Sequence, residues 1–338
     1  MRVLVVSHYN PDAFEYGGLA TFVRELSRGL RALGYEVHYV AVSPTATRRY
    51  RGVRLVPSGF SPEELDYRLH EVVRLCAELD GLYDVIVAND YFSPCVARES
   101  RLVAYVHTYA GSPWELLLFS YADRICTNSR LSKSTFEEHA RFVRHLTSPW
   151  TGKPLVEVEV LYPPPPEPPG RTVVPEGLPE LGDNVLCFVG RMQEHKNFEA
   201  FRGLVLKLGV DGLVVSHDAE SRVEVYGESR IVYVGNAPEE VKWGLMGRCT
   251  LGVVPSLYEP YGLVALEFVR AGVPVVVSRN CGVAEVLEPL TFDPQNPREM
   301  EEVTREALRF RDDYLAELQD RPIMRKTWAE FAEELLRF

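Results

Sequence analysis

The sequence predicts an α/β fold made of two doubly wound parallel-sheet domains. Short apolar runs alternate with stretches whose apolar residues recur every three or four positions, as in successive strand–helix–strand units. A proline-rich stretch, residues 163–170, interrupts this series near its middle and cannot form a helix or a central strand. The 338 residues are enough for about two domains of roughly 100–200 residues each.

The first strand–helix–strand unit begins at the N-terminus. Residues 3–6 form a continuous apolar run, which predicts a buried parallel strand. Residues 19–33 carry apolar side chains at helical spacing, and Gly34 ends this helix. Residues 37–42 form the second strand. Later strands of the first domain are predicted at 53–56, 84–88, 102–106 and 124–127, with a helix between about 62 and 79.

A second series follows the prolines. We predict a first domain over residues 1–165 and a second over 166–324. Strands of the second domain are predicted at 184–189, 212–216, 231–234, 250–254 and 274–278. The segment 325–338 carries a helical apolar stripe that must be buried against another element. Its members are Trp328, Phe331, Ala332, Leu335 and Leu336.

Composition narrows the functional classes. Residues 1–150 carry 17 basic and 17 acidic residues, so the net charge of −11 belongs to the remainder, with 37 − 17 = 20 basic and 48 − 17 = 31 acidic residues. This acidic half argues against nucleic acid as a partner. No apolar run of about 18 residues occurs, and the strand at residue 3 leaves no room for a signal peptide. Six scattered cysteines without a Cys-x-x-Cys pair argue against a zinc ribbon or a disulfide framework, and Cys187 is expected to be a buried reduced thiol. We expect a cytoplasmic protein.

Two glutamates mark the most informative segment. Glu259 lies in a loop after the strand at 250–254, and Glu267 lies on the helix that follows, before the strand at 274–278. Carboxylates suit sugar or ribose binding because each accepts several hydroxyl hydrogen bonds. Ligands of open α/β sheets bind at this carboxyl edge. The helix starts at Tyr261, Gly262 and Leu263, whose amides can bind phosphate.

Positive charge is expected in a second loop. Gly190 ends the strand at 184–189, and Arg191 and Lys196 follow it. A fixed arginine and a lysine together neutralise a leaving diphosphate. The neighbouring His195 is expected to be a spectator.

The first domain offers further candidates. Gly17 and Gly18 precede its first helix, where glycines permit close approach of a ligand to the helix N-terminus. No Gly-x-Gly-x-x-Gly follows the first strand, which disfavours a nicotinamide-dependent oxidoreductase. His107 follows the strand at 102–106 and is predicted to point into the ligand crevice. Asp90 is a weaker candidate, and Ser129 is expected to be a helix N-cap.

These segments together resemble the group 1 (family 4) retaining glycosyltransferases. The likeness is strongest over residues 1–42, 185–197 and 250–287. It implies the GT-B fold, in which two Rossmann-like domains face each other across a cleft and the closing helix 325–338 packs back on the first domain.

The resemblance also assigns roles. Glu259 and His107 would contact the donor sugar, Glu267 the ribose, and Arg191 and Lys196 the diphosphate of a nucleoside-diphosphate-sugar donor. Arg191, Lys196, Glu259 and His107 are therefore the candidate catalytic residues. The donor is a co-substrate, so we expect no cofactor. No metal is expected either, because Asp-x-Asp occurs nowhere in the chain.

Three departures from the family pattern leave alternatives open. Residues 215–219 replace a Gly-rich turn, and Cys281 stands where the first of two glycines is usual. A non-catalytic sugar-nucleotide-binding protein and a GT-B epimerase or phosphorylase therefore remain alternatives. Glu15 replaces the lysine of glycogen and starch synthases, which counts against a polysaccharide synthase. The acceptor, a glycan, a lipid or a small molecule, is not identified, and peripheral membrane contact stays open.

Overall fold

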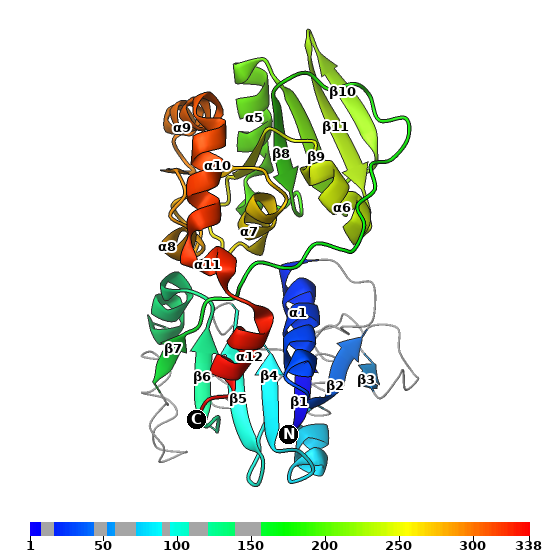
Figure 1. Cartoon of the computed structure of the whole chain (residues 1–338), viewed down its shortest axis with the longest axis vertical. Helices are drawn as coiled ribbons and strands as arrows, with labels where there is room; N and C mark the ends of the chain where they lie inside the picture. Colours follow the sequence, from blue (N-terminus) through cyan, green and yellow to red (C-terminus); the bar gives the residue numbers. More distant parts are fainter. Residues whose placement is uncertain (8–16, 44–52, 58–71, 90–94, 108–120, 139–156) are drawn as a thin grey trace. The chain divides into compact units, whose positions relative to one another are not determined.

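The computed structural model describes residues 1–7, 17–43, 53–57, 72–89, 95–107, 121–138 and 157–338. The chain divides into two compact units, one comprising Met1–Pro163 with Thr327–Phe338 and the other Pro164–Lys326. The boundaries predicted from the sequence, 165 and 325, each lie two residues from these junctions. Figure 1 labels the elements of both units.

The sheet of the first unit is parallel throughout. Its strands run in the order β3-β2-β1-β4-β5-β6-β7. Their bounds are β1 Arg2–Ser7, β2 Glu36–Ser43, β3 Val53–Pro57, β4 Val85–Asn89, β5 Arg101–Val106, β6 Arg124–Thr127 and β7 Val158–Val160. Each predicted strand is present. The three-residue edge strand β7 was not predicted, because it lacks a continuous apolar run.

The closing helix belongs to the first unit. Helix α12 (Trp328–Leu335) lies beside α1 (Gly18–Ala32), as Figure 1 shows. A Cβ atom at Gly29 of α1 would lie 2.2 Å from the carbonyl oxygen of Trp328, so a larger residue there would separate the helices. The ring of Phe22 meets those of Trp328 and Phe331 edge-on, at centroid distances of 5.5 and 5.7 Å. This contact buries most of the apolar stripe at the C-terminus.

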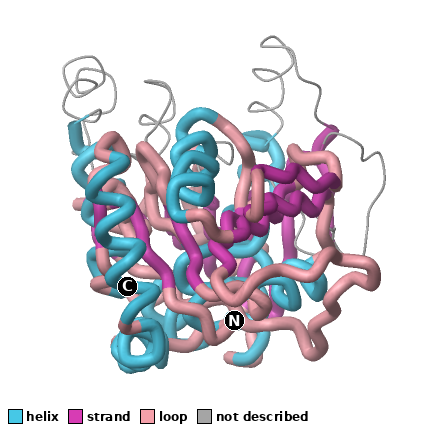
Figure 2. The backbone as a smooth tube through the Cα atoms, turned by 90° about the horizontal axis from the view of Figure 1, so that it is seen from above, coloured by secondary structure: helices cyan, strands magenta, loops and turns pink. Residues whose placement is uncertain are grey.

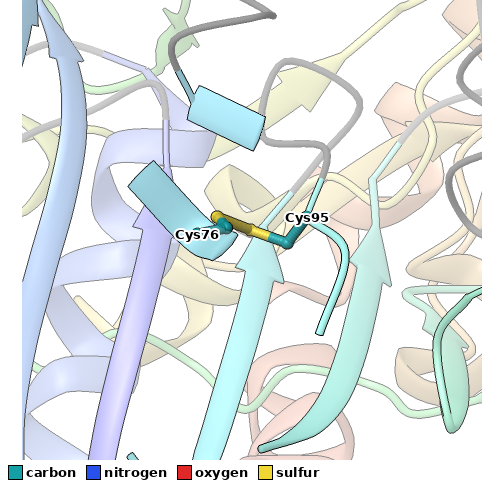
Figure 3. The surroundings of a disulfide bond; sticks show 2 residues. All are labelled: Cys76 and Cys95. Atoms are coloured by element: carbon teal, nitrogen blue, oxygen red, sulfur yellow. A yellow bond between two sulfur atoms is a disulfide. The ribbon is translucent and has the colours of Figure 1, made fainter. Parts of the chain in front are cut away.

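One pair of cysteines is bonded within the first unit. Cys76, on the helix over residues 72–79, forms a disulfide with Cys95 (Figure 3). Both side chains are buried in the apolar core of the first unit. The sequence argued against a disulfide framework and did not predict this single bond, because residues 19 positions apart meet only through the fold. Cys187 is a buried free thiol, as expected.

The sheet of the second unit differs from the first in strand order at one edge, where β10 pairs with β11. Its strands run β10-β11-β9-β8-β12-β13-β14, and every neighbouring pair is parallel except β10 with β11. Their bounds are β8 Val185–Val189, β9 Asp211–Ser216, β10 Arg222–Tyr226, β11 Ser229–Gly235, β12 Leu251–Val254, β13 Val275–Ser278 and β14 Thr291–Phe292. The edge strands β10 and β14 were not predicted. Strand β10 is antiparallel and half-exposed. The predicted strands were recognised as continuous apolar runs, which are typical of buried parallel strands.

Helices flank this sheet, and Figure 2 colours the helices of the whole chain cyan. Those of the second unit are the short 3₁₀ helix η1 Glu194–Lys196 and the α-helices α5 Phe198–Leu208, α6 Glu239–Met246, α7 Leu263–Arg270, α8 Ala284–Leu287, α9 Pro297–Arg309, α10 Arg311–Asp320 and α11 Pro322–Arg325. Within the described residues, no helix combines the length and the apolar character needed to cross a bilayer.

The strand order sets where a ligand can bind. The strand order changes direction between β1 and β4 in the first sheet and between β8 and β12 in the second. The loops after such strands diverge and leave a crevice at the carboxyl edge. The residues that follow β8 and β12 are therefore candidates for a ligand-binding site.

Candidate functional site

The loops after β8 and β12 meet at the carboxyl edge of the second sheet. Strand β8 ends at Val189, and Gly190 turns the chain with a φ of 149°. The 3₁₀ helix η1 follows, and the carbonyl oxygen of its His195 accepts a hydrogen bond from Leu257 N at 2.8 Å. This contact joins the predicted cationic loop to the segment that carries Glu259.

Lys196 and Glu259 form an ion pair across these two loops. The side chain of Lys196 is 23% exposed and that of Glu259 is 13% exposed, so both are shielded but reachable. The structure thus places a diphosphate-binding candidate in contact with a sugar-binding candidate. Their proximity did not follow from either motif alone.

A third loop fixes the backbone of Glu259. Its N–H donates to the carbonyl of Asn280 at 3.0 Å, and its carbonyl accepts from Gly282 N at 3.0 Å. Val283 N donates to the carbonyl of Tyr261 at 2.7 Å. The loop after β13 therefore holds the whole turn that leads into α7.

Gly262 is the N-cap of α7 and requires a conformation that favours glycine. Its φ is 99°, in the left-handed region, and a Cβ atom there would lie 3.2 Å from Cγ of Glu259. The first amides of a helix lack partners within the helix and attract anions. The conformation and small size of Gly262 thus allow Glu259 to lie beside the first turn of α7.

The loop after β8 also carries Arg191. Burial lowers the pKa of His195, and the charges of Lys196 and Arg191 lower it further. Arg191 is exposed at the start of the same loop. The pKa of His195 is therefore held below its usual value.

Glu267 belongs to a separate, buried cluster. It lies on α7, and its Oε1 accepts a hydrogen bond from Nζ of Lys242 on α6 at 2.9 Å. Nζ of Lys242 is also 3.1 Å from Oε1 of Glu239. Burial lowers the pKa of Lys242, but the two carboxylates outweigh this and hold it above its usual value. Lys242 was not among the site residues predicted from the sequence, although its spacing from Glu239 on a helix was a signal for an ion pair.

The family departures have a definite structure. His217 Nε2 lies 2.9 Å from Oδ1 of Asp218, directly after β9, so an imidazole and a carboxylate replace the usual glycines. Cys281 is buried, and burial together with the charge of Glu259 raises the pKa of its thiol to about 12. The thiol is therefore neutral and packs behind the turn that carries Glu259.

In the first unit, His107 ends a row of hydrogen-bonded strand ends. Its Nε2–H donates to Oδ1 of Asn89 at 2.8 Å, and the amide of Asn89 donates to Oγ of Ser7 at 3.2 Å. The carbonyl of His107 accepts from Asn128 Nδ2 at 3.0 Å. Burial lowers the pKa of His107 to about 3, so its ring is neutral.

Gly17 and Gly18 lie at the start of the helix that covers His107. Gly17 is the N-cap of α1, with a φ of 112°, and a Cβ atom at either glycine would meet nothing within 4 Å. The ring of Phe22, on the same helix, meets His107 edge-on at 4.4 Å between centroids. Ser129 accepts from Ser132 N at 3.0 Å and so caps the next helix, as predicted. The candidates Glu15 and Asp90 lie outside the described residues.

The structure therefore assembles the predicted residues in groups. In the second unit, Lys196, Glu259 and Gly262 are in contact, with Gly190, Arg191, Tyr261 and Leu263 on the same loops. Glu267 lies with Lys242 on the buried side of α7. In the first unit, Gly17, Gly18 and His107 share the carboxyl edge of the sheet. Among the described residues, no cluster of histidine, cysteine and carboxylate side chains has the arrangement of a metal site.

Two family models match this arrangement of domains. The model of Glycosyltransferase Family 4 matches residues 16–148, and that of the Glycosyl transferases group 1 matches residues 173–325. The chain belongs to the group 1 glycosyltransferases. The second match contains Arg191, Lys196, Glu259 and Glu267 together.

Curated relatives of this glycosyltransferase are distant but span most of the chain. A glycogen synthase from Mycobacterium tuberculosis is 25% identical over 346 aligned positions, covering 85% of this chain and 80% of its own. A D-inositol 3-phosphate glycosyltransferase from an Arthrobacter species is 27% identical, covering 82% of this chain and 77% of its own.

Solved structures show the same fold. A trehalose-6-phosphate protein from E. coli, bound with UDP-2-fluoro glucose, superposes with a TM-score of 0.72 at 17% identity, covering 100% of this chain and 99% of its own. The catalytic domain of starch synthase IV from Arabidopsis thaliana, bound to ADP and acarbose, gives a TM-score of 0.67 at 12% identity, covering 98% of each chain. With two parallel-sheet α/β units, the glycosyltransferase has the GT-B fold.

Proposed function

We propose that this glycosyltransferase moves a sugar from a nucleoside-diphosphate donor to an acceptor hydroxyl, with retention of the anomeric configuration. The observation that carries the proposal is the contact of Lys196 with Glu259 beside the N-terminus of α7. A cation, a carboxylate and helix amides are the groups that a sugar diphosphate needs, at the edge where open sheets bind ligands.

Leaving-group stabilisation falls to the cationic loop. As the bond between the anomeric carbon and the phosphate oxygen breaks, negative charge grows on the diphosphate. Arg191 and Lys196 offset this charge, together with the amides that follow Gly262. Groups already held in place by their loops stabilise developing charge without reorganising.

The acceptor attacks from the face that the diphosphate leaves. A new bond forms between the anomeric carbon and the acceptor oxygen, and the acceptor proton passes to the departing phosphate oxygen. This step balances without a dedicated base on the protein. Glu259 binds sugar hydroxyls, and Glu267 binds the ribose. His107 is neutral and donates its Nε2–H to Asn89, so its Nδ1 accepts one hydrogen bond from a sugar hydroxyl.

The relatives suggest which acceptors to try. One relative bears the name glycogen synthase and another the name D-inositol 3-phosphate glycosyltransferase. Because Glu15 replaces the lysine of polysaccharide synthases, a small phosphorylated polyol or a lipid is the first acceptor class to test, and an α-glucan is the second.

The experiment has two stages. Calorimetric titration is carried out with UDP, GDP, ADP and their glucose or mannose conjugates. We expect the nucleotides of one base to bind with a much lower Kd than the others. Transfer from that donor is then followed by proton NMR, where an anomeric coupling unchanged from the donor indicates retention. Binding of no nucleoside diphosphate would overturn the proposal. Donor binding without transfer to any acceptor would favour a non-catalytic sugar-nucleotide-binding protein. Conversion of the donor to its epimer, or its cleavage by phosphate, would favour an epimerase or a phosphorylase.

A further inference from the structure

We propose that Lys242 is a positioning residue for ribose recognition: it holds the carboxylate of Glu267 in the orientation that accepts hydrogen bonds from the ribose hydroxyls. This inference rests on the proposed function, which assigns the ribose to Glu267. It starts from the 2.9 Å contact of Lys242 Nζ with Glu267 Oε1, between two helices of the second unit.

Both helices are fixed independently of this contact. A Cβ atom at Gly244 of α6 would lie 2.3 Å from the carbonyl of Val173, and Val173 N donates to the carbonyl of Glu240 at 2.9 Å. Helix α7 is equally close to its strand, because a Cβ at Gly252 of β12 would lie 2.5 Å from the ring of Phe268. The backbone positions of Lys242 and Glu267 are therefore set by packing, and their ion pair fixes only side-chain orientation.

The charges of the cluster argue against a purely structural pair. One ammonium meets two carboxylates, those of Glu239 and Glu267. The side chains of Lys242 and Glu267 are 12% and 6% exposed. Buried ion pairs add little net stability compared with apolar residues. Carboxylate oxygens at this position suit a ligand that brings hydroxyl donors.

Hydroxyl recognition is compatible with the lysine contact. A carboxylate has about four acceptor sites, so Glu267 can bind Lys242 through Oε1 and still accept from a ribose diol. A carboxylate fixed by a cation loses less rotamer freedom when ligand binds. Lys242 would thus raise affinity for the ribose hydroxyls and leave the diphosphate contacts of Lys196 unchanged.

The test compares nucleoside diphosphates with their 2′-deoxy analogues. Kd is measured by calorimetry for the preferred base, in both forms, with the wild type and with Lys242→Met. We expect the wild type to prefer the ribose form by about 10- to 100-fold, the equivalent of one hydrogen bond to a charged group. In Lys242→Met this ratio should fall towards one. The control is Lys207→Met, which removes a lysine that pairs with Glu301 at 2.6 Å elsewhere in the second unit, and it should keep the wild-type ratio.

Each outcome decides. A wild-type ratio retained by Lys242→Met would overturn the positioning role while leaving the proposed function intact. Equal Kd values of the wild type for the ribose and 2′-deoxy forms would also overturn the positioning role and leave the proposed function intact. Binding of neither form by the wild type would overturn both. If Lys242→Met does not fold, Lys242→Arg serves instead, because a planar guanidinium does not replace an ammonium in a fixed pair. Its ratio should change at least about threefold, and an unchanged ratio would overturn the role.

Discussion

Lys196, after β8, and Glu259, after β12, neutralise each other in the second unit. A diphosphate and Glu259 would compete for the same ammonium. We therefore expect Glu259→Gln to bind the bare nucleoside diphosphate more tightly than the wild type, by about two- to fivefold for a partly exposed pair. The same variant should transfer sugar more slowly, because Glu259 binds the sugar. Calorimetry and initial rates measure the two effects, and tighter binding without slower transfer would contradict the assigned role.

Lys196→Met should have the opposite effect on binding. Loss of the cation removes a donor to the leaving diphosphate, which typically lowers kcat by about 10²–10³-fold. Weaker diphosphate binding should accompany this loss. Lys207→Met is the matched control, since Lys207 pairs with Glu301 rather than with a site residue. Equal rates for Lys196→Met and the control would exclude Lys196 from the site.

Gly262→Ala should separate a backbone effect from a site effect. The left-handed conformation costs a residue with a side chain about 1–2 kcal/mol, and the new methyl group would press on Cγ of Glu259 at 3.2 Å. Gly209→Ala is the control, since Gly209 has a φ of 67° but open space around its Cα. Thermal unfolding should show similar losses for both variants, and initial rates should fall in Gly262→Ala alone. Loss of activity in Gly209→Ala as well would point to a general loss of stability.

The neutral ring of His107 predicts a pH dependence of stability. Its pKa is about 3 in the folded protein, against 6.5 for an unperturbed histidine, so below pH 6.5 the unfolded chain binds the additional proton. The free energy of unfolding should therefore decrease as the pH falls from 6.5 towards 3. Between pH 7 and 5 the loss attributable to His107 is up to about 2 kcal/mol. Urea unfolding of His107→Gln should show a shallower dependence, and identical slopes would refute the assignment.

The disulfide predicts sensitivity to reductant. Cys76 and Cys95 close a loop of 19 residues, and loops of this size contribute about 3 kcal/mol by restricting the unfolded chain. Dithiothreitol should lower the Tm of the wild type but leave that of the double variant Cys76→Ala, Cys95→Ala unchanged. Six reactive thiols per unfolded, unreduced chain would show that the bond does not form.

Metal removal should leave activity unchanged. Arg191 and Lys196 supply the positive charge that a divalent cation would otherwise supply to the diphosphate. Initial rates with EDTA should therefore equal those with added Mg²⁺. A rate that disappears with EDTA and returns with Mg²⁺ would contradict this role of the two cations.

The parts of the fold that the sequence predicts are those with buried parallel strands. Central parallel strands such as β1 are covered on both faces, and their sequences are therefore continuous apolar runs. Strand β10 escaped prediction because Val223 and Val225 on it are exposed while Glu224 faces Arg202, a pattern set by an edge position. The spacing of apolar residues along a strand does not indicate whether that strand lies at the edge of a sheet.

The candidate site was predictable where its residues share one loop. Glu259, Gly262 and Glu267 are close in sequence, so one motif identifies them. Lys242 was not predictable as a partner of Glu267, because the two lie 25 residues apart and meet only when α6 and α7 flank the same sheet. The disulfide was missed for the same reason.

The twelve residues from Thr327 to Phe338 belong to the compact unit that begins at Met1. On the ribosome, residues 1–163 therefore stay without α12 until residues 164–326 have been made, with Phe22 lacking the rings of Trp328 and Phe331. The continuous unit 164–326 emerges complete before then. Expression of residues 1–163 alone would thus produce an unfinished domain, whereas a permuted gene that places 327–338 ahead of Met1 would let each half mature in turn.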